Sequence, residues 1–411
     1  MIKWQEVKLR DITTKIGDGL HGTPSYDELG KYYFINGNNF SNGKIVIKKD
    51  TDKVSEDEFK KIKRDLTDKT ILVSINGTLG NVALYNNETV GLGKSACYIN
   101  VNKTVSRDFI RYCIDNPYFR RYADLYSTGS TIKNLSLKAV RDFKINLPPF
   151  STQQKIVKIL SKYDDLFENN LKRIKLLEES GRLTYEEWFL RFRVDGKKLE
   201  INPTSGLPFK WEKKSITEFD AFKQDKQKSK EFKGEKKYYA TADVSETVIT
   251  ADGETINWDN KPSRAQIKPN NNTVWFARMS DTYKVLCFNN KNINLQENSI
   301  ISSGFAGFKA KNDLCLPFLY FTINSKFFHE LKNLYATGAT QVSLNNDSMS
   351  FIKIIEPNAD LVEEFGSRTL PFIEEISILR SKNQLLKEAR DILLPRLMTA
   401  TINTDKIDIT V

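Results

Sequence analysis

The chain has 411 residues, too many for one small domain, so we expect two or three domains, each with its own core. Hydrophobic residues make up 39% and charged residues 28% of the chain, which argues against wholesale disorder. The 63 Lys and Arg outnumber the 52 Asp and Glu, and the resulting net charge of +11 favours a polyanionic partner.

The sequence also limits the cellular setting and the chemistry. No apolar run approaches the about 18 residues of a transmembrane helix, and the N-terminus lacks the apolar core of a signal peptide. We therefore expect a cytoplasmic protein without a membrane partner. Two histidines, His21 and His329, are too few for a histidine metal cluster. The cysteines lack the Cys-x-x-Cys spacing of zinc sites and predict no disulfide framework: Cys97, Cys113, Cys287 and Cys315.

Residues 1–150 form the first predicted globular domain. Short β-branched or aromatic runs such as Ile71–Ser74 and Phe143–Leu147 lie between Asn and Gly turns, as strands do. A helical pattern from about Arg107 to Leu125 is interrupted at Asp115-Asn116-Pro117, which we interpret as a turn between two helices. This mixture indicates the α+β class.

Residues 151–193 are predicted as a long helix. The stretch contains no proline, and Ser151 or Thr152 can serve as its N-cap. Positions spaced alternately four and three apart form a heptad seam with a polar interruption. The seam positions are Ile156, Leu160, Tyr163, Phe167, Asn170, Ile174, Leu177, Gly181, Thr184 and Trp188.

Residues 194–208 are predicted as a linker because turn-forming pairs such as Asp195-Gly196 are concentrated there. Beyond this linker the chain repeats itself. The segment Leu125–Thr131 recurs as Leu334–Thr340, 209 residues later, and further upstream Val82–Tyr85 matches Val285–Phe288. The repeat predicts a second globular domain over residues 209–357.

Residues 358–400 are predicted as the second long helix, followed by a tail over residues 401–411. Pro371 and Pro395 are expected to kink this helix or to trim its ends. Its seam lies 209 residues after the first seam: Phe365, Thr369, Phe372, Ile376, Leu379, Asn383, Leu386, Arg390, Leu393 and Leu397.

The two helices are expected to bury their seams against each other, since a globular domain could cover only one end of each. Antiparallel pairing would put the two globular domains at opposite ends. The predicted fold is therefore α+β, with two similar strand-rich domains separated by an antiparallel coiled coil and related by an internal pseudo-twofold repeat.

Three familiar motifs are present only in part. Gly17–Gly22 fits G-x-G-x-x-G, but Thr23-Pro24 follows it where a dinucleotide site needs a helix. Gly93-Lys94-Ser95 resembles the end of a phosphate-binding loop, yet Glu88 stands where the first glycine is required. Asp115–Tyr118 superficially resembles an adenine methyltransferase tetrapeptide, but it interrupts a helix. No catalytic constellation recurs in both repeats, which argues against a catalytic repeat unit.

What recurs is loop chemistry that suits a polar, anionic ligand. Several loops are rich in Gly, Asn, Ser and Thr, which offer backbone N–H groups and short side-chain donors. For any one loop, a simple turn is the favoured interpretation, about two to one. Lys and Arg are in excess over residues 101–150 and 223–237, although a solvated face would explain either run. The loops span residues 17–23, 36–39, 76–81 and 127–134.

Two similar domains with different loops, each followed by a long helix, resemble the specificity subunit of type I restriction-modification systems over essentially the whole chain. Four segments carry this resemblance: Gly17–Pro24, Leu147–Pro149 leading into Gln153–Ile156, Leu160–Leu166 with Asp164-Asp165, and Leu393–Met398. The last is the most distinctive. The second domain departs from the pattern, having Lys223–Lys228 where the first has the glycine loop.

The resemblance implies that each globular domain is a target-recognition domain for one half of a bipartite site in double-stranded DNA. The helices would separate these domains and dock modification subunits, two of them, with an ATP-dependent restriction subunit as an optional further partner. The chain itself would be non-catalytic and without cofactor or metal, and S-adenosylmethionine would bind the modification subunit.

The loops and the resemblance together give candidate site residues. The predicted DNA contacts are Gly17, Asp18, His21, Gly22, Thr23, Asn38, Lys94, Ser130, Thr131, Lys133, Lys223, Lys226, Lys228, Arg278, Lys284, Thr340 and Gln341. Leu393, Leu394, Leu397 and Met398 are predicted to dock a modification subunit, or equally to close the end of the coiled coil.

Two alternatives belong to other classes. A non-enzymatic scaffold would bind proteins or a small ligand with its two domains and use the coiled coil as a spacer. Salt separates this scaffold from a DNA-binding protein. A protein that neutralises several DNA phosphates loses affinity steeply as the salt concentration rises, whereas a protein-binding scaffold need not. A stand-alone nuclease or methyltransferase is disfavoured by the missing active site.

Overall fold

The computed structural model describes residues 4–338 and 342–402. The chain divides into two compact units. Unit 1 comprises Met1–Phe167 and Leu385–Val411, and unit 2 comprises Glu168–Gln384. Each unit therefore holds one strand-rich head together with a part of each long helix, and the predicted linker 194–208 lies within unit 2.

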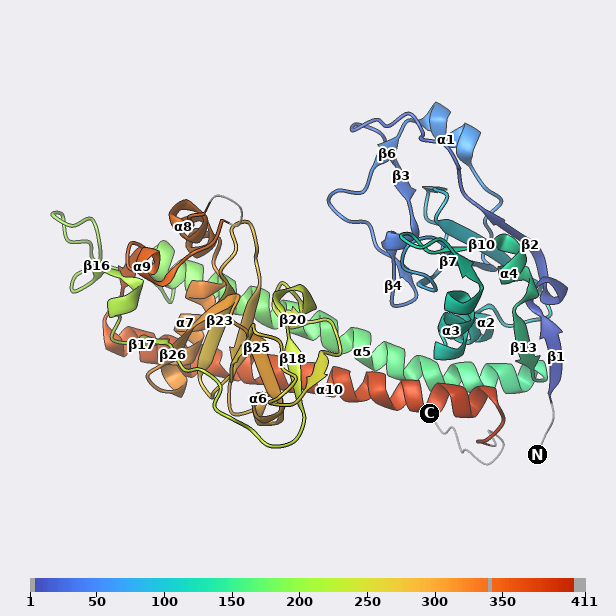
Figure 1. Cartoon of the computed structure of the whole chain (residues 1–411). Coiled ribbons are helices and arrows are strands. Elements are labelled where there is room, and N and C mark those ends of the chain that lie inside the picture. The colour runs from blue at the N-terminus through green and yellow to red at the C-terminus, as the bar shows by residue number, and fades with distance from the viewer. Residues whose placement is uncertain (1–3, 339–341, 403–411) are drawn as a thin grey trace. The chain divides into compact units, whose positions relative to one another are not determined.

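The head of unit 1 is built on two small sheets (Figure 1). The first is antiparallel, in the order β2-β10-β7-β8, and its central strands β7 and β10 are buried along their whole length. The second has the order β6-β3-β9, with β3 and β9 parallel. The strands are β2 (Thr13–Asp18), β3 (Tyr32–Ile35), β6 (Lys53–Val54), β7 (Thr70–Ser74), β8 (Val82–Leu84), β9 (Val90–Leu92) and β10 (Ala96–Val101).

Short helices and hairpins complete this head. The predicted helix-to-helix turn is confirmed, because the Asn116 side chain caps α3 by accepting from Tyr118 N–H and Pro117 takes the first helical position. The elements are α1 (Glu56–Ile62), α2 (Arg107–Ile114), α3 (Pro117–Tyr126), α4 (Leu137–Asp142), and the strand pairs β1 (Gln5–Lys8) with β13 (Lys144–Leu147), β4 (Phe40–Ser41) with β5 (Lys44–Ile45), and β11 (Ser127–Thr128) with β12 (Asn134–Leu135).

The head of unit 2 repeats this plan, which confirms the repeat found in the sequence. Its sheets have the orders β17-β26-β23-β24 and β21-β18-β25-β22, and β18 is parallel to β25 just as β3 is to β9. The strands are β17 (Phe222–Asp225), β18 (Lys236–Tyr239), β21 (Glu254–Ile256), β22 (Ala265–Ile267), β23 (Thr273–Ala277), β24 (Val285–Phe288), β25 (Ser299–Ser302) and β26 (Phe305–Ala310).

The remaining elements of unit 2 surround these sheets. The helices are α6 (Ile293–Asn298), α7 (Leu316–Ile323), α8 (Lys326–Tyr335) and α9 (Asn346–Met349). The strand pairs are β14 (Arg193–Val194) with β15 (Lys197–Lys198), β16 (Glu212–Ser215) with β27 (Lys353–Glu356), and β19 (Val244–Ser245) with β20 (Val248–Ile249).

The long helices are α5 (Phe150–Tyr185), which ends in a π-helical turn (Glu186–Leu190), and α10 (Ala359–Met398). The first α-helix thus begins one residue before the predicted N-caps and ends eight residues before the predicted Arg193, where the chain widens into the π-helical turn. Pro371 and Pro395 lie inside α10, so the expected trimming at these prolines is wrong. Buried Phe365 and Ile373 pack into the core of unit 2 on either side of Pro371, which holds the helix in place there.

The two helices run antiparallel within each unit, as predicted. In unit 2, Asn170 and Arg173 of α5 bond Asn383 and Glu375 of α10, so the residue numbers rise along one helix as they fall along the other. In unit 1, Ile156 and Leu160 of α5 share a buried core with the end of α10: Leu394, Leu397 and Met398. The heptad seam is therefore buried against both the partner helix and the head.

The core of unit 2 is dominated by aromatic side chains. The Phe189 ring centroid lies 5.0 Å from that of Phe318 and 5.1 Å from that of Phe365, which joins α7 to both long helices. No helix in the described part of the chain is long and apolar enough to cross a membrane. The same described residues contain no group of three or more His, Cys, Asp or Glu side chains that could hold a metal ion.

Candidate nucleic-acid interface

One edge of the head of unit 1 gathers five loops. In the antiparallel sheet Asp18 pairs with Cys97 and Ser74 with Ala96, so β2 and β7 end where β10 begins. The parallel strands β3 and β9 end at the same edge, where Gly93 N–H donates to Ile35 O. We call these loops rim 1: residues 18–23, 36–39, 75–81, 93–95 and 127–134.

Hydrogen bonds between the loops hold rim 1 together. Leu20 N–H donates to Leu92 O at 2.7 Å, and Gly77 N–H donates to Lys133 O at 2.9 Å. The Ser95 hydroxyl accepts from Gly37 N–H at 2.8 Å and donates to Asn36 Oδ1 at 3.0 Å. The structure thus brings the sequence-predicted residues of the first domain to one edge, although nothing in it tests their contact with DNA.

The glycine loop of rim 1 is explained by backbone packing. A Cβ at Gly19 would lie 2.1 Å from Leu92 O, so only glycine lets β9 approach this closely. At the same loop, His21 Nε2 lies 2.7 Å from Asp18 Oδ2, and the histidine side chain is 65% exposed. The motif therefore presents an oriented imidazole at the surface, and no helix follows the loop where a dinucleotide site needs one.

The remaining predicted residues of rim 1 are also at the surface. Lys133 Nζ lies 2.5 Å from Asp124 Oδ1, and both side chains are about half exposed. An exposed ion pair of this kind is weak and can be exchanged for a phosphate contact. The other exposed predicted residues are Gly22, Thr23, Asn38, Lys94, Ser130 and Thr131.

Unit 2 forms an equivalent edge, rim 2, from residues 226–234, 240–243, 278–284, 302–304, 336–338 and 342–343. Ser280 N–H donates to Val342 O at 2.9 Å, which repeats the bond between Gly77 and Lys133 in rim 1. The isolated bridge between Met279 and Ser343 likewise repeats the bridge between Asn76 and Asn134. Thr340 and Gln341, both predicted contacts, lie outside the described residues.

The predicted residues of rim 2 fall into two groups. Lys223, Lys226 and Lys228 are exposed on β17 and the loop that follows it. Arg278 is half-buried, and its guanidinium donates to Phe305 O, Leu344 O and Asn346 Oδ1 at 3.2, 3.1 and 2.9 Å. Burial lowers the pKa of Arg278. Lys284 Nζ donates to Thr241 O at 2.7 Å, so Arg278 and Lys284 both tie loops together.

Sequence reasoning missed two buried polar residues on α8 behind rim 2. Lys332 is 0% exposed, and its ammonium donates to three backbone carbonyls of the β23–β24 loop. His329 is also buried, and its Nδ1 has no hydrogen-bond partner among the described residues; burial and then Lys332 lower its pKa to about 4. The only available signal was the repeat alignment, which places Ala123 opposite Lys332.

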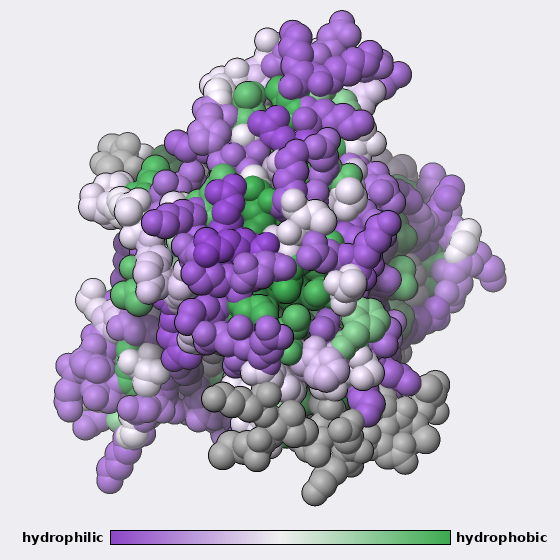
Figure 2. Space-filling model, turned by 90° about the vertical axis from the view of Figure 1, so that its right-hand side faces the viewer, coloured by the Kyte–Doolittle hydropathy of each residue, from purple (hydrophilic) through white to green (hydrophobic). Residues whose placement is uncertain are grey.

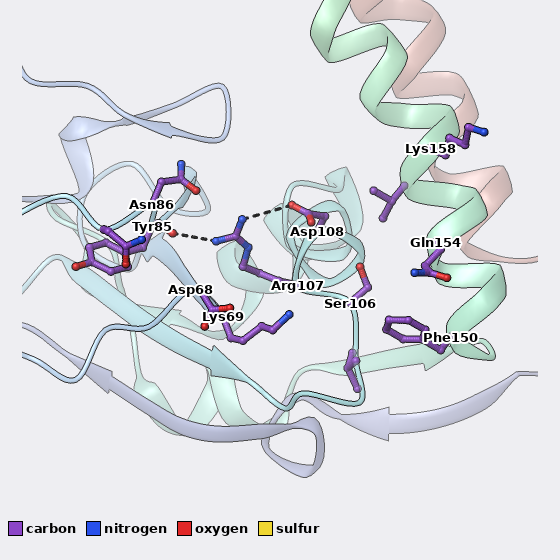
Figure 3. Close-up of a pocket in the computed structure, with 13 residues that line it drawn as sticks. Asp68, Lys69, Tyr85, Asn86, Ser106, Arg107, Asp108, Phe150, Gln154 and Lys158 are labelled. Carbon is purple, nitrogen blue, oxygen red and sulfur yellow. Dashed lines mark hydrogen bonds and ion pairs between the residues drawn. The ribbon is translucent and has the colours of Figure 1, made fainter. Parts of the chain in front are cut away.

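A cleft of about 590 Å³ lies at the opposite edge of the unit 1 sheet, beside the beginning of α5 (Figure 3). Arg107 stands at its centre, donates to Tyr85 O at 2.9 Å and lies 4.0 Å from Asp108. The wall of the cleft contains acidic and basic side chains together with the apolar Phe150 and Val157. The charged groups do not converge as a catalytic site requires.

Three of the four predicted docking residues at the end of α10 are buried within unit 1. Leu394, Leu397 and Met398 are buried in the core of unit 1, where Met398 Sδ lies 3.7 Å from Cys113 Sγ, and Leu393 is half-buried. Their burial fits the alternative interpretation, closure of the coiled-coil end.

A different set of apolar residues is exposed on the long helices. Leu176 and Leu183 of α5 are 69% and 44% exposed, and Leu385 and Ile392 of α10, 209 residues later, are 63% and 55% exposed. Each pair is spaced seven residues apart and forms a stripe on the solvent side of its helix. Small hydrophobic groups among predominantly hydrophilic side chains are also visible on the face in Figure 2.

Comparisons with known proteins agree with this architecture. Residues 1–179 match the family described as Type I restriction modification DNA specificity domain. The chain is 23% identical over 423 residues to the type I restriction enzyme MjaIX specificity subunit of Methanocaldococcus jannaschii, covering 98% of this chain and 94% of that protein. It is 23% identical over 345 residues to the HindI specificity subunit of Haemophilus influenzae, covering 69% and 74%.

A solved structure shows the same fold. The crystal structure of a type I restriction-modification S subunit from M. genitalium matches with a TM-score of 0.54 and 15% sequence identity, over 96% of both chains.

Proposed function

We propose that the chain belongs to the type I restriction-modification specificity family, because residues 1–179 match the family model and a relative that is 23% identical covers nearly the whole chain, and from this premise we infer how it acts. It is the DNA-specificity subunit of such a system. Each rim contacts one half of a bipartite target in double-stranded DNA. Two rims with the same scaffold and different side chains are the observation that supports this assignment most directly.

The side chains of the rims suit contacts both to DNA bases and to the phosphates of the DNA backbone. Exposed Asn, Ser, Thr and His side chains can bond base edges, while Lys94, Lys133 and the lysines after β17 can neutralise phosphates. Rim 1 offers the imidazole of His21, whereas rim 2 offers a lysine-rich loop in its place. This difference supports two half-sites of different sequence.

We further propose that the chain is non-catalytic and carries no cofactor. Its role is to direct modification subunits, which bind S-adenosylmethionine and transfer the methyl group, and a restriction subunit where one joins. Since DNA is the proposed ligand, the cytoplasm is the proposed site of action. The exposed stripes on α5 and α10 are the proposed docking sites, one for each of two identical modification subunits, because equal stripes recur at equivalent positions of the repeat.

Methylation mapping of host genomic DNA tests the proposal. We expect one bipartite motif to be methylated in cells that carry the chain with its modification subunit, and to lose methylation when the gene for this chain is deleted. An unchanged methylation pattern would contradict the assignment. A scaffold that binds only proteins would also leave the pattern unchanged, so the same experiment separates the two functions.

A further inference from the structure

The loops that follow β7 and β23 are equivalent hairpins at the centres of the two rims. Ser74 N–H donates to Asn81 O at 2.8 Å in unit 1, and Ala277 N–H donates to Lys284 O at 3.0 Å in unit 2. Both loops also dock on the following hairpin through the same backbone bond, described above. Ala277 therefore stands where the first repeat has Ser74.

In unit 1 the loop is fastened from within by Ser74. Its hydroxyl donates to Thr78 O at 2.6 Å and accepts from Asn81 N–H at 2.8 Å. Gly80 N–H donates to Ser74 O at 2.9 Å. Gly80 has a φ of +81°, a backbone conformation that favours glycine. The α3 residue at the position equivalent to Lys332 is Ala123, which is buried and whose methyl side chain offers this loop no hydrogen bond.

In unit 2 the hydroxyl is missing and α8 supplies the fastening. Lys332 Nζ donates to Thr282 O at 2.6 Å, to Met279 O at 2.8 Å and to Ala277 O at 3.3 Å. These bonds use all three donors of an ammonium. The two repeats therefore fasten this loop in different ways. The first repeat has a serine at the end of the strand and an alanine on the helix. The second repeat has an alanine at the end of the strand and a lysine on the helix.

Burying an ammonium is costly unless it gains bonds that only a cation can make. The groups that face Lys332 are the carboxylate of Asp281, the ring of Tyr283 at 5.9 Å and the buried, neutral His329. Burial lowers the pKa of Lys332 to about 8, and Asp281 acts in the opposite direction. The Asp281 carboxylate accepts from Asn333 Nδ2 at 3.0 Å. No ion pair joins a carboxylate to the Lys332 ammonium among the described residues.

We propose that Lys332 is a positioning residue for one half-site: it fixes the loop 278–283 of rim 2 in the shape that reads DNA, the task that Ser74 performs in rim 1. The inference rests on the proposed function. Its consequence is asymmetric, because loss of Lys332 impairs one half-site and loss of the Ser74 hydroxyl impairs the other.

The test compares Lys332→Met with Ser74→Ala in the complete complex, by methylation mapping in host cells. Methionine keeps the apolar stem and removes the donors. We expect Lys332→Met to reduce discrimination at the half-site read by unit 2 by about tenfold, the equivalent of one lost charged hydrogen bond, and to leave the other half-site unchanged. Ser74→Ala should relax the opposite half-site. Equal relaxation of both half-sites, or of neither, would overturn the proposal.

A second measurement applies to the unmutated complex and decides the question if Lys332→Met does not fold. Purified complex methylates sheared genomic DNA at pH 7 and pH 9. Because burial lowers the pKa of Lys332 to about 8, a rise from pH 7 to pH 9 shifts its ammonium toward the neutral amine, which has one N–H donor fewer. We expect relaxation at the unit 2 half-site alone, with the other half-site as internal control.

The rise from pH 7 to pH 9 should not lower the thermal midpoint through Lys332. The pKa of this lysine is lower in the folded than in the unfolded chain, so its charged form destabilises the fold, and this destabilisation is lost as the pH rises. Unchanged discrimination at pH 9 would refute the role of Lys332. Absence of sequence-dependent methylation at both pH values would instead refute the proposed function.

Discussion

Arg390 of α10 donates to the Asp164 carboxylate of α5 at 3.1 Å. The same carboxylate accepts from Arg111 at 2.6 Å and from the Tyr112 hydroxyl at 2.8 Å, both on α2. One largely buried ion cluster therefore fastens the helix pair to the head of unit 1. Burial would raise the pKa of Asp164, but Arg111 first, then Tyr112 and Arg390, hold it below its usual range.

Replacing Asp164 by Asn should lower the free energy of unfolding by about 3 kcal/mol, because it leaves two arginines without their shared counter-charge. Asp165→Asn is the matched control, since Asp165 is exposed. Urea unfolding of the purified chain measures both. Equal stabilities of the two variants would mean that the cluster does not hold the head to the helices.

A polar pair interrupts the apolar seam of unit 2, where Asn170 Nδ2 donates to Asn383 Oδ1 at 2.8 Å and both side chains are buried. Asn170→Leu alone should destabilise by about 1–3 kcal/mol by leaving buried amide groups of Asn383 with one partner fewer. Asn170→Leu with Asn383→Leu should recover that loss. The double-mutant cycle, measured by thermal unfolding, gives the coupling. Additive effects would exclude a direct role for this bond.

The repeat and the helix seams carried most of the fold information in the sequence. Heptad spacing located both long helices because burial along a seam enforces the period, and equivalent loops followed from the repeat. The sequence allowed Pro371 either to kink the helix or to end it; the helix does not end there, because Phe365 and Ile373 pack into the core on both sides of the proline. Leu394 was ambiguous in sequence, since an apolar stripe does not reveal whether a head or a partner covers it. Lys332 escaped notice because a lone lysine on a helix ordinarily lies in solvent.

Gly181 of α5 lies close against Phe321 in the head of unit 2. A Cβ there would lie 2.1 Å from Phe321 Cζ, although alanine is the better helix former. We expect Gly181→Ala to lower stability by about 1–3 kcal/mol through overpacking. Ser180→Ala, at an exposed neighbouring position, should be neutral or slightly stabilising. Thermal unfolding compares the two, and a stabilising Gly181→Ala would disprove this close contact.

Rim 1 should determine one half-site only. His21→Ala combined with Lys133→Ala removes one imidazole and one ammonium from exposed loops, so folding should be preserved. We expect discrimination at one half-site to fall by about tenfold, corresponding to the about 1–3 kcal/mol of a base contact, while the other half-site keeps its sequence. Lys103→Ala, exposed after β10 at the opposite edge, serves as control. Methylation mapping that shows both half-sites relaxed together would contradict the assignment of one rim to one half.

The exposed stripes on the long helices should each bind one modification subunit. Leu176→Glu with Leu183→Glu introduces two charges into one stripe without touching a buried side chain, and Leu385→Glu with Ile392→Glu does the same in the other. Because a desolvated carboxylate is costly in an apolar interface, each double variant should assemble with one modification subunit instead of two, and the combined variant with none. Lys175→Glu is the control, since it is exposed on α5 away from the stripe. Native mass spectrometry of the co-expressed complex counts the subunits. Two modification subunits on the combined variant would show that docking occurs elsewhere on the chain.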